Sequence, residues 1–355
     1  MTIEWLAGNR IRGTTAERPA LGLPSGSVGG WVEVGRTTLG SAGDTISVTS
    51  LPDKRYYMIL GDKQTSGTTD FNIRYNNDSA NNYASRYNDN GGSDGTQTST
   101  SKTIHTGSGS FNEFVVGNIT SLSGKEKLSI TQGMGGSTGA SNAPSRREAV
   151  GKWSNTSDAI NRIDVVNLAG GDYASGAECV VLGWDPDSDS HTTNFWEELA
   201  SVEISGDPAN WDSGTFAAKK YLWIQVYHKP SGTGSGTEWR WLFNADSGTN
   251  YAQRQSYSGG ADSTNTSLGY FSAHYNNTTP QFENMFIVNN SSNEKLIISH
   301  LVRGETAGSA TAPSRFEKVG KWANTSSQIT KLTSVRPTGA GTIGDGSWMK
   351  VWGSD

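Results

Sequence analysis

The chain has few of the residues that cross-link a fold or carry it through a membrane. Its 355 residues include one cysteine, Cys179, so neither an intrachain disulfide framework nor a thiolate zinc site is expected. No stretch approaches roughly 18 consecutive apolar residues, and the sequence therefore predicts no membrane insertion. The first residues lack the long apolar segment of a secretory signal peptide, so we expect synthesis in the cytoplasm of the producing cell.

Charge is also sparse. Charged residues make up 18% of the chain, with 29 Lys and Arg against 34 Asp and Glu, which gives a net charge of −5. No long run of basic residues occurs. Binding to a nucleic-acid backbone depends on such clusters of positive charge, so nucleic acid is not an expected partner.

Signals for catalysis are nearly absent. There is no G-x-x-x-x-G-K-[ST] phosphate loop, and Glu197 and Glu198 are adjacent, so on a strand they point to opposite faces and form a poor glycosidase pair. The histidines are isolated, with no pair at metal-ligand spacing: His105, His191, His228, His274 and His300. We predict a protein without enzymatic activity and without a cofactor.

Glycine and aromatic residues, by contrast, are plentiful. The chain contains 44 Gly, together with 12 Trp, 12 Tyr and 10 Phe. Disordered proteins are poor in aromatic residues because they bury little apolar surface, so this polar chain is expected to fold. A composition rich in turn formers and aromatic residues favours an all-β protein.

An internal repeat organises the sequence. APSRREAVGKWSNTSDAI begins at Ala143 and APSRFEKVGKWANTSSQI at Ala312, and 13 of these 18 aligned positions are identical. Trp31 pairs with Trp196, and Tyr83 and Tyr251 lie 168 residues apart. This period is far longer than the repeats of solenoids or propellers, so each copy is expected to be a complete domain produced by duplication.

Short alternating runs within each copy predict strands. DTISVTS and FNIRY alternate apolar and polar residues, as in strands that bury one face. In the first copy we expect strands near 31–38, 44–49, 55–61, 69–75, 81–87, 98–106, 111–119, 126–132, 146–153, 159–166 and 177–184. The sequence therefore predicts two tandem β-sandwich domains, jelly-roll-like, over 31–184 and 195–355, joined by a linker over 185–194.

Residues 1–30 belong to neither copy. Prolines and glycines suit this segment to an extended arm rather than to a domain of its own. It nevertheless carries apolar anchors, which predict that it docks on a partner: Ile3, Trp5, Leu6, Ile11, Leu21 and Leu23. The alternative is that the arm folds back on its own first sandwich.

The repeated block is better explained by structure than by a ligand. On a strand, Arg146, Glu148, Val150 and Lys152 share one face. The opposite face carries Arg147, Ala149, Gly151 and Trp153. We expect the charged row to lie outside and Trp153 to pack in the core.

Two further patterns have competing interpretations. Trp239 and Trp241 lie two residues apart near Tyr251, so they could form a platform on which sugar rings stack, but Phe71 and Ile73 occupy the corresponding positions of the first copy, which favours core packing. The acidic run with Asp185, Asp187 and Asp189 has the alternate oxygen ligands of a calcium loop. Because the EF-hand glycine and closing glutamate are missing, a solvated linker is favoured.

Several segments resemble bacteriophage proteins. NRIRGTTAERPALG is similar to the N-terminal leaders of tail-fibre and virion-appendage proteins. GRTTLGSAGDTISVTSLPDKRYYMIL and NNYASRYNDNGGSD resemble uncharacterised structural proteins of environmental and marine phages. The resemblance covers essentially the whole chain, implies a component of the virion, and supplies no active-site residues.

The leading hypothesis is therefore a non-enzymatic virion structural protein: a tail fibre, head fibre or capsid-decoration subunit that docks through its arm and displays its sandwiches outward for host attachment. Its expected partners are capsid or tail proteins, further copies of itself in an oligomer such as a trimer, and a glycan of the host surface. A carbohydrate-binding receptor adhesin is the main alternative, and it predicts an exposed aromatic pair. A virion-associated glycan depolymerase is the third hypothesis, and it predicts a cleft with paired carboxylates.

Overall fold

The computed structural model describes residues 30–185, 194–206, 208, 210–231, 238–275, 279–304, 308–335 and 342–355. Regular secondary structure within these ranges is β-strand throughout. None of the described residues belongs to a helix that is long and apolar enough to cross a membrane. Apart from Gly30, the predicted N-terminal arm lies outside the described residues.

The first half of the chain forms two antiparallel sheets. The larger has eight strands in the order β1-β12-β3-β8-β9-β10-β5-β6, and the smaller has four in the order β2-β11-β4-β7. Their bounds are β1 (Val32–Thr38), β2 (Thr45–Thr49), β3 (Tyr56–Lys63), β4 (Thr69–Tyr75), β5 (Tyr83–Asp89), β6 (Gly95–Ser99), β7 (Lys102–Gly109), β8 (Glu113–Thr120), β9 (Lys127–Gly135), β10 (Ser145–Trp153), β11 (Arg162–Val166) and β12 (Glu178–Trp184). We call this unit domain 1.

The second half, domain 2, repeats this arrangement. Its eight-stranded sheet has the order β13-β26-β15-β21-β22-β23-β18-β19, its four-stranded sheet has the order β14-β24-β17-β20, and a short pair joins β16 to β25. The bounds are β13 (Glu197–Glu203), β14 (Trp211–Asp212), β15 (Tyr221–His228), β16 (Pro230–Ser231), β17 (Glu238–Phe243), β18 (Tyr251–Tyr257), β19 (Ser263–Leu268), β20 (Phe271–Tyr275), β21 (Gln281–Val288), β22 (Lys295–Arg303), β23 (Ser314–Trp322), β24 (Leu332–Val335), β25 (Thr342–Ile343) and β26 (Trp348–Ser354).

The period-two pattern of the sequence accounts for each sandwich. In β2, Ile46 and Val48 are buried while Thr49 is exposed, because successive side chains of a strand point to opposite sides. Similar residues of β4 and β3 close the core between the small and the large sheet, including Phe71, Ile73 and Ile59. The all-β fold with two sandwich-like halves is confirmed, and the matching strand orders fit a structural duplication.

The repeated tryptophans occupy equivalent core positions. Trp153 ends β10 and Trp322 ends β23, and both indoles are almost completely buried. The Trp153 Nε1–H donates to Asp78 Oδ2 at 2.7 Å, and the Trp322 Nε1–H donates to Asp246 Oδ2 at the same distance. Burial of the indole ring together with its one polar group explains why the block is retained in both halves.

The charged row of the same block is placed differently from the prediction. Arg146 is buried instead of exposed, because domain 2 covers this end of the strand and supplies Asp262 and Glu317 as ion-pair partners. On the opposite face, Arg147 is also buried, with its guanidinium 4.3 Å from the Tyr87 ring centre. Val150, in contrast, lies exposed.

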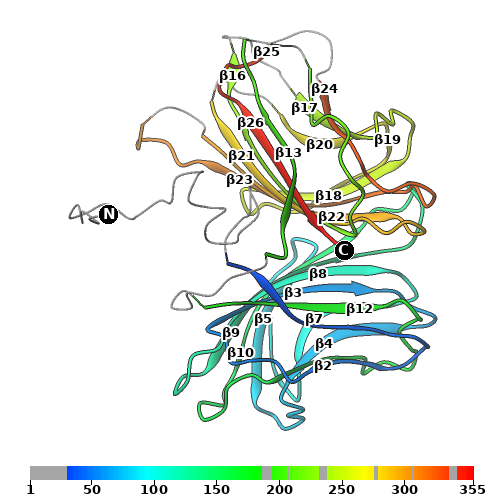
Figure 1. Ribbon diagram of the computed structural model, residues 1–355, viewed down its shortest axis with the longest axis vertical. Coiled ribbons are helices and arrows are strands. Elements are labelled where there is room, and N and C mark those ends of the chain that lie inside the picture. Colours follow the sequence, from blue (N-terminus) through cyan, green and yellow to red (C-terminus); the bar gives the residue numbers. More distant parts are fainter. Residues whose placement is uncertain are drawn as a thin grey trace, which may run out of the picture.

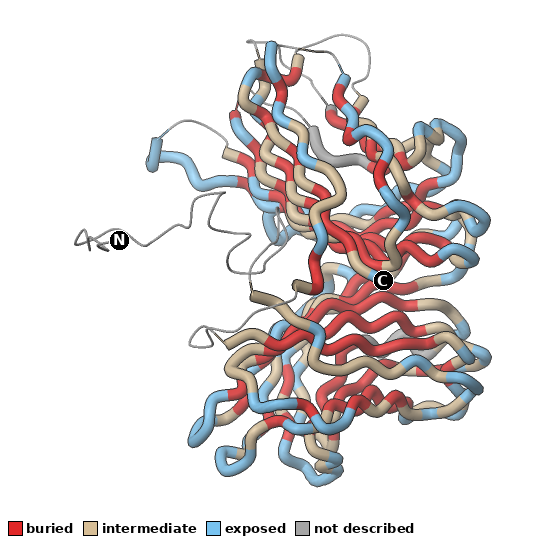
Figure 2. The backbone as a smooth tube through the Cα atoms, in the orientation of Figure 1, coloured by how far each residue is buried: buried red, intermediate tan, exposed pale blue. Residues whose placement is uncertain are grey.

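The two sandwiches pack through the outer faces of their large sheets. Figure 1 shows β3, β8 and β12 of domain 1 running across the view and β13 and β26 of domain 2 rising steeply from them. A separate apolar cluster joins the sheets, and Figure 2 shows the continuous buried zone at this junction. The molecule therefore has four layers, with the two large sheets in the middle and a small sheet on each outer side.

We expect Trp153→Ala and Trp322→Ala each to lower the free energy of unfolding by about 3–5 kcal/mol, because each removes a buried indole and leaves a cavity. Chemical denaturation of both variants would measure the change. Leu168→Ala, at a position that is 51% exposed, is the matched control and should shift stability by about 0.5 kcal/mol or less. Melting of the tryptophan variants at the wild-type temperature would contradict their assignment to the core.

Candidate functional site

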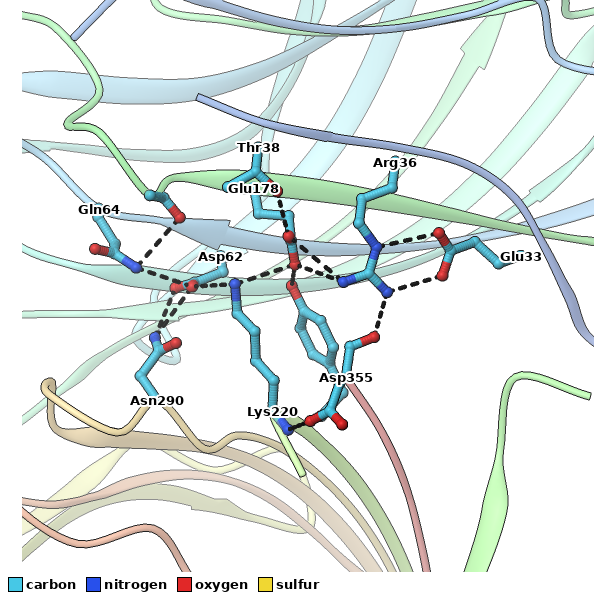
Figure 3. Close-up of polar contacts among 11 residues, drawn as sticks. Glu33, Arg36, Thr38, Asp62, Gln64, Glu178, Lys220, Asn290 and Asp355 are labelled. Atoms are coloured by element: carbon cyan, nitrogen blue, oxygen red, sulfur yellow. Dashed lines mark hydrogen bonds and ion pairs between the residues drawn. The ribbon is translucent and has the colours of Figure 1, made fainter. Parts of the chain in front are cut away.

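One end of the interface between the domains is closed by buried ions. Glu178 and Asp62 of domain 1 are almost completely buried, and Lys220 of domain 2 lies between them, with its Nζ 3.0 Å from Glu178 Oε1 and 3.2 Å from Asp62 Oδ2 (Figure 3). The Tyr221 hydroxyl donates to Glu178 Oε1 at 2.8 Å, and Asn290 Nδ2 donates to Asp62 Oδ2 at 3.0 Å. Domain 2 thus supplies donors to both carboxylates.

Glu178 shows how these contacts act. Burial by itself raises the pKa of this carboxyl, but the hydrogen bond from Thr38 and the charge of Lys220 outweigh it and hold the pKa below its usual value. Arg36 of β1 adds a further contact at 3.4 Å. The carboxylate is therefore ionised at neutral pH, and removing one partner would leave a buried charge uncompensated.

A second polar cluster lies along the same interface, in strands β9 and β10. Arg146 pairs with Asp262 at 2.8 Å and with Glu317 at 3.3 Å. Gln132 and His300, which occupy equivalent positions in β9 and β22, meet at 3.3 Å. Ion pairs at two places on an apolar contact fix its register and orient one domain on the other.

The two domains contact each other through different halves of the outer faces of their large sheets. The strand registers match Tyr56 with Tyr221 and Val150 with Val319, which allows each face to be divided into the same two patches. The entry patch lies at the end of the large sheet where the first strand of each domain begins; it is Trp31, Tyr56, Leu128, Ile130 and Val150 in domain 1 and Trp196, Tyr221, Leu296, Ile298 and Val319 in domain 2. The far patch is Leu60, Phe114, Val116, Met134 and Val180 in domain 1 and Gln225, Phe282, Asn284, Val302 and Lys350 in domain 2. The entry patch of domain 2 packs on the far patch of domain 1.

The entry patch of domain 1 is left open as a groove of about 960 Å³. Trp31 and Trp184 have ring centres 5.9 Å apart, and Tyr56 stacks on Trp184 at 5.4 Å. Leu128, Ile130 and Val150 form the apolar part of its floor. Asn118 and Lys152 lie next to Ile130 and Leu128 in the sheet, and Arg86 and Gln97 line the groove beside them. A groove with an apolar floor and polar edges is suited to binding an extended ligand or chain segment.

The far patch of domain 2 is the second open surface. Tyr227 and Trp348 extend it with nearly parallel rings 6.4 Å apart, and Phe282 lies 6.4 Å from Trp348. The amides of Gln225 and Asn284 are hydrogen-bonded at 3.2 Å beside them. This surface combines aromatic rings with amide groups, in contrast to the apolar far patch of domain 1.

The predicted saccharide platform is not at the surface. Trp239, Trp241 and Tyr251 are 3%, 2% and 0% exposed, because β17 is an inner strand of the small sheet and turns both indoles toward the large sheet. Phe71 and Ile73 are buried at the corresponding positions of domain 1. The preferred interpretation, core packing, is confirmed, and the alternative of sugar stacking on these three residues is wrong.

Other candidate residues lie outside the described part of the chain. These are the arm anchors Ile3, Trp5, Leu6, Ile11, Leu21 and Leu23, together with Asp187 and Asp189 of the calcium candidate. Asp185 follows β12 at the end of domain 1. Among the described residues, no group of three or more His, Cys, Asp or Glu side chains is arranged to hold a metal ion.

A small, mainly apolar cavity of about 10 Å³ inside domain 2, with His228 and Glu283 in its wall, was not predicted. It is lined by His228, Glu283, Trp239, Trp241 and other core residues. The Trp241 Nε1–H donates to Glu283 Oε2 at 3.0 Å, and burial raises the pKa of Glu283. Burial also lowers the pKa of His228 to about 3, and among the described residues neither of its ring nitrogens has a hydrogen-bond partner.

Both open surfaces were missed at the sequence level. Trp31 was paired with Trp196 in the sequence repeat, and the repeat itself was the signal. Trp196 is buried at the interface between the domains, whereas Trp31 is partly buried and lines the groove. The adjacent Glu197 and Glu198 diverge as expected, toward Lys219 at 3.5 Å and Lys350 at 2.9 Å respectively.

Comparisons with known proteins add little to this description. No protein-family model matches the chain, and no curated protein sequence matches it. Among solved structures, domains LG4-5 of the mouse laminin alpha1 chain align over 92% of this chain and 89% of that chain, at 10% sequence identity and a TM-score of 0.18. A similarity at that TM-score supports no statement about function.

His228 should make domain 2 sensitive to mild acid. Above pH 6.5 the His228 imidazole is neutral in the folded and in the unfolded chain. Below pH 6.5 the unfolded chain takes up a proton on this residue, whereas the folded chain, in which the pKa is lowered to about 3, does not. We therefore expect stability to fall by about 1.4 kcal/mol per pH unit below about 6.5, until the pH reaches the folded pKa. Denaturation curves of wild type and His228→Phe between pH 6.5 and 5 test this, and parallel pH dependence of the two proteins would contradict it.

Proposed function

We propose that this chain is a non-enzymatic structural component of a bacteriophage particle, a tail fibre, head fibre or capsid-decoration subunit that displays its sandwiches outward. One observation carries the proposal: an apolar contact joins the two domains into one body, and the aromatic far patch of domain 2 stays uncovered by the other domain. The sequence resemblance to phage appendage proteins supports the virion assignment, with other virion proteins and further copies of the chain as partners.

The interface suits a display element. An apolar cluster from both large sheets joins the domains, and ion pairs such as Arg146–Asp262 and Lys220–Glu178 hold its orientation. Tandem domains linked by a small polar contact move relative to each other, whereas a large apolar contact suppresses that motion. A rigid pair of domains presents a recognition surface at a fixed distance from its attachment point.

Attachment is assigned to the N-terminal arm. Its first twelve residues carry Ile3, Trp5, Leu6 and Ile11, whose exposure to water would be unfavourable. An extended segment loses conformational entropy when it becomes ordered, and the burial of such anchors on a partner offsets that loss.

Removal of residues 1–12 should leave a folded protein that no longer joins phage particles, because the deletion removes these anchors and leaves both sandwiches intact. Labelling purified particles with an antibody to the chain measures incorporation, and circular dichroism reports the fold. A Gly-Ser segment of equal length in place of residues 1–12 separates the loss of anchors from the loss of length. Labelling at wild-type density in either variant would overturn the assignment.

Glycan recognition by the far patch of domain 2 is a second candidate function. Tyr227, Phe282 and Trp348 are half-buried and form a row with the amides of Gln225 and Asn284 beside it. Aromatic faces stack on the apolar faces of sugar rings, and amides pair with hydroxyl groups. This surface, rather than Trp239 and Trp241, has the composition that a host-surface adhesin needs.

If this surface binds glycans, Trp348→Ala should reduce retention on immobilised bacterial surface polysaccharide at least tenfold, because the indole is the central ring of the row. A glycan array with the wild-type protein identifies the ligand. Leu168→Ala, on a loop outside both surfaces, should bind as the wild type does. Equal binding by all three proteins would exclude this face as the sugar site.

A further inference from the structure

The two entry patches share the five residue types named above and have opposite exposure, but Asn118 and Thr120 stand in domain 1 where domain 2 buries Phe286 and Val288. In domain 2, Leu296, Ile298 and Val319 are 4%, 2% and 2% exposed beneath domain 1. Their equivalents in domain 1 are also Leu, Ile and Val, and Leu128, Ile130 and Val150 are 53%, 58% and 48% exposed. Domain 1 therefore has the apolar side chains that make a protein–protein contact in domain 2, but none of the described residues of another domain covers them.

A second copy of this chain is a poor occupant of the groove. In the contact between the domains, an entry patch packs on a far patch. A second copy would therefore have to dock on the groove with its own uncovered far patch, which is the one of domain 2. There, Gln225, Asn284 and Lys350 replace Leu60, Val116 and Val180. Docking that patch on the groove would place two amides over Leu128, Ile130 and Val150, which is unfavourable. It would also bring Lys350 to a surface that already carries the cations Arg86 and Lys152.

Domain 2 also shows which element is missing from domain 1. Phe195, just before the first strand, packs on Trp196 with ring centres 4.9 Å apart and lies 6.4 Å from Tyr221. The equivalent of Phe195 in domain 1 is Gly30, which has no side chain to place there. An apolar residue from the chain preceding Gly30 could take this position.

The preceding chain has the right length and composition. Residues 1–29 join domain 1 directly at Gly30 and Trp31, and Trp31 lines the groove. From β1 across β12, β3 and β8 to β9 is about 19 Å, because neighbouring strands lie about 4.8 Å apart. The seven residues from Leu23 to Gly30 span about 23 Å when extended, so Leu23 can reach Ile130.

We propose that residues 13–29 dock in the groove of their own domain 1, with Leu21 and Leu23 against the floor formed by Leu128, Ile130 and Val150. The segment covers the apolar surface that domain 1 covers in domain 2. Residues 1–12 then extend from a fixed point on the surface of domain 1. This inference concerns the chain itself and stands independently of the proposed role in the virion.

A disulfide trap in the full-length chain tests the placement. Leu23→Cys combined with Ile130→Cys should form an intrachain bond under mild oxidation, seen as a mobility shift of the monomer on a non-reducing gel. The native Cys179 is buried, and burial raises the pKa of its thiol to about 12, so it does not compete. The matched control pairs Leu23→Cys with Leu168→Cys, an exposed position on a loop after β11.

The two outcomes that would overturn the proposal are distinct. A disulfide-linked dimer would show that the groove takes the segment of a second copy, and equal cross-linking of the test and control pairs would show that the segment has no fixed place.

A second measurement does not depend on the cysteines. Ile130→Asp changes an exposed side chain, so the sandwich should remain folded, but it places a charge on the groove floor. Thermolysin should then cleave before Leu21 and Leu23 at least tenfold faster than in the wild type, whereas Leu168→Asp should leave that rate unchanged. Wild-type cleavage rates in Ile130→Asp would overturn the proposal.

Discussion

The contact between the outer faces of the two large sheets is the constraint on which the remaining structure depends. A sandwich needs only one buried face on each sheet, yet β3 and β8 are buried on both. That second burial explains runs such as YYMILG and FVVG, in which apolar residues do not alternate with polar ones. It also places charged groups such as Asp62 and Glu178 where each must find a partner from the other domain.

Much of the fold could be predicted because its determinants are local or repeated. Alternation in DTISVTS and FNIRY identified strands, and the repeat around Trp153 and Trp322 identified two equivalent domains. The surfaces were harder to predict, because alternation separates the two faces of a strand without showing what covers each. Trp239 and Trp241 lie two residues apart in β17, and Gln225 and Tyr227 lie two residues apart in β15, yet the first pair faces the core and the second lies on the outer face.

Ionisable groups illustrate the same limit. Arg146 was expected outside because a charged side chain on the outer face of an isolated sandwich meets water. Its partners Asp262 and Glu317 are more than a hundred residues away, and only the packing of the domains brings them together. His228 shows the opposite case: it lies in the core of domain 2 beside Trp239, where the cost of burying charge keeps it neutral.

The polar far patch of domain 2 has a consequence for assembly. A contact between two different patches of the same domain type is heterologous, so each added domain offers the next binding site, and the series either closes into a ring or extends as a filament. Two fused domains with apolar patches at both ends would therefore associate further. Lys350, at the position held by Val180 in domain 1, interrupts the apolar character of this patch, so the contact that joins the two domains is not offered a second time at the free face of domain 2.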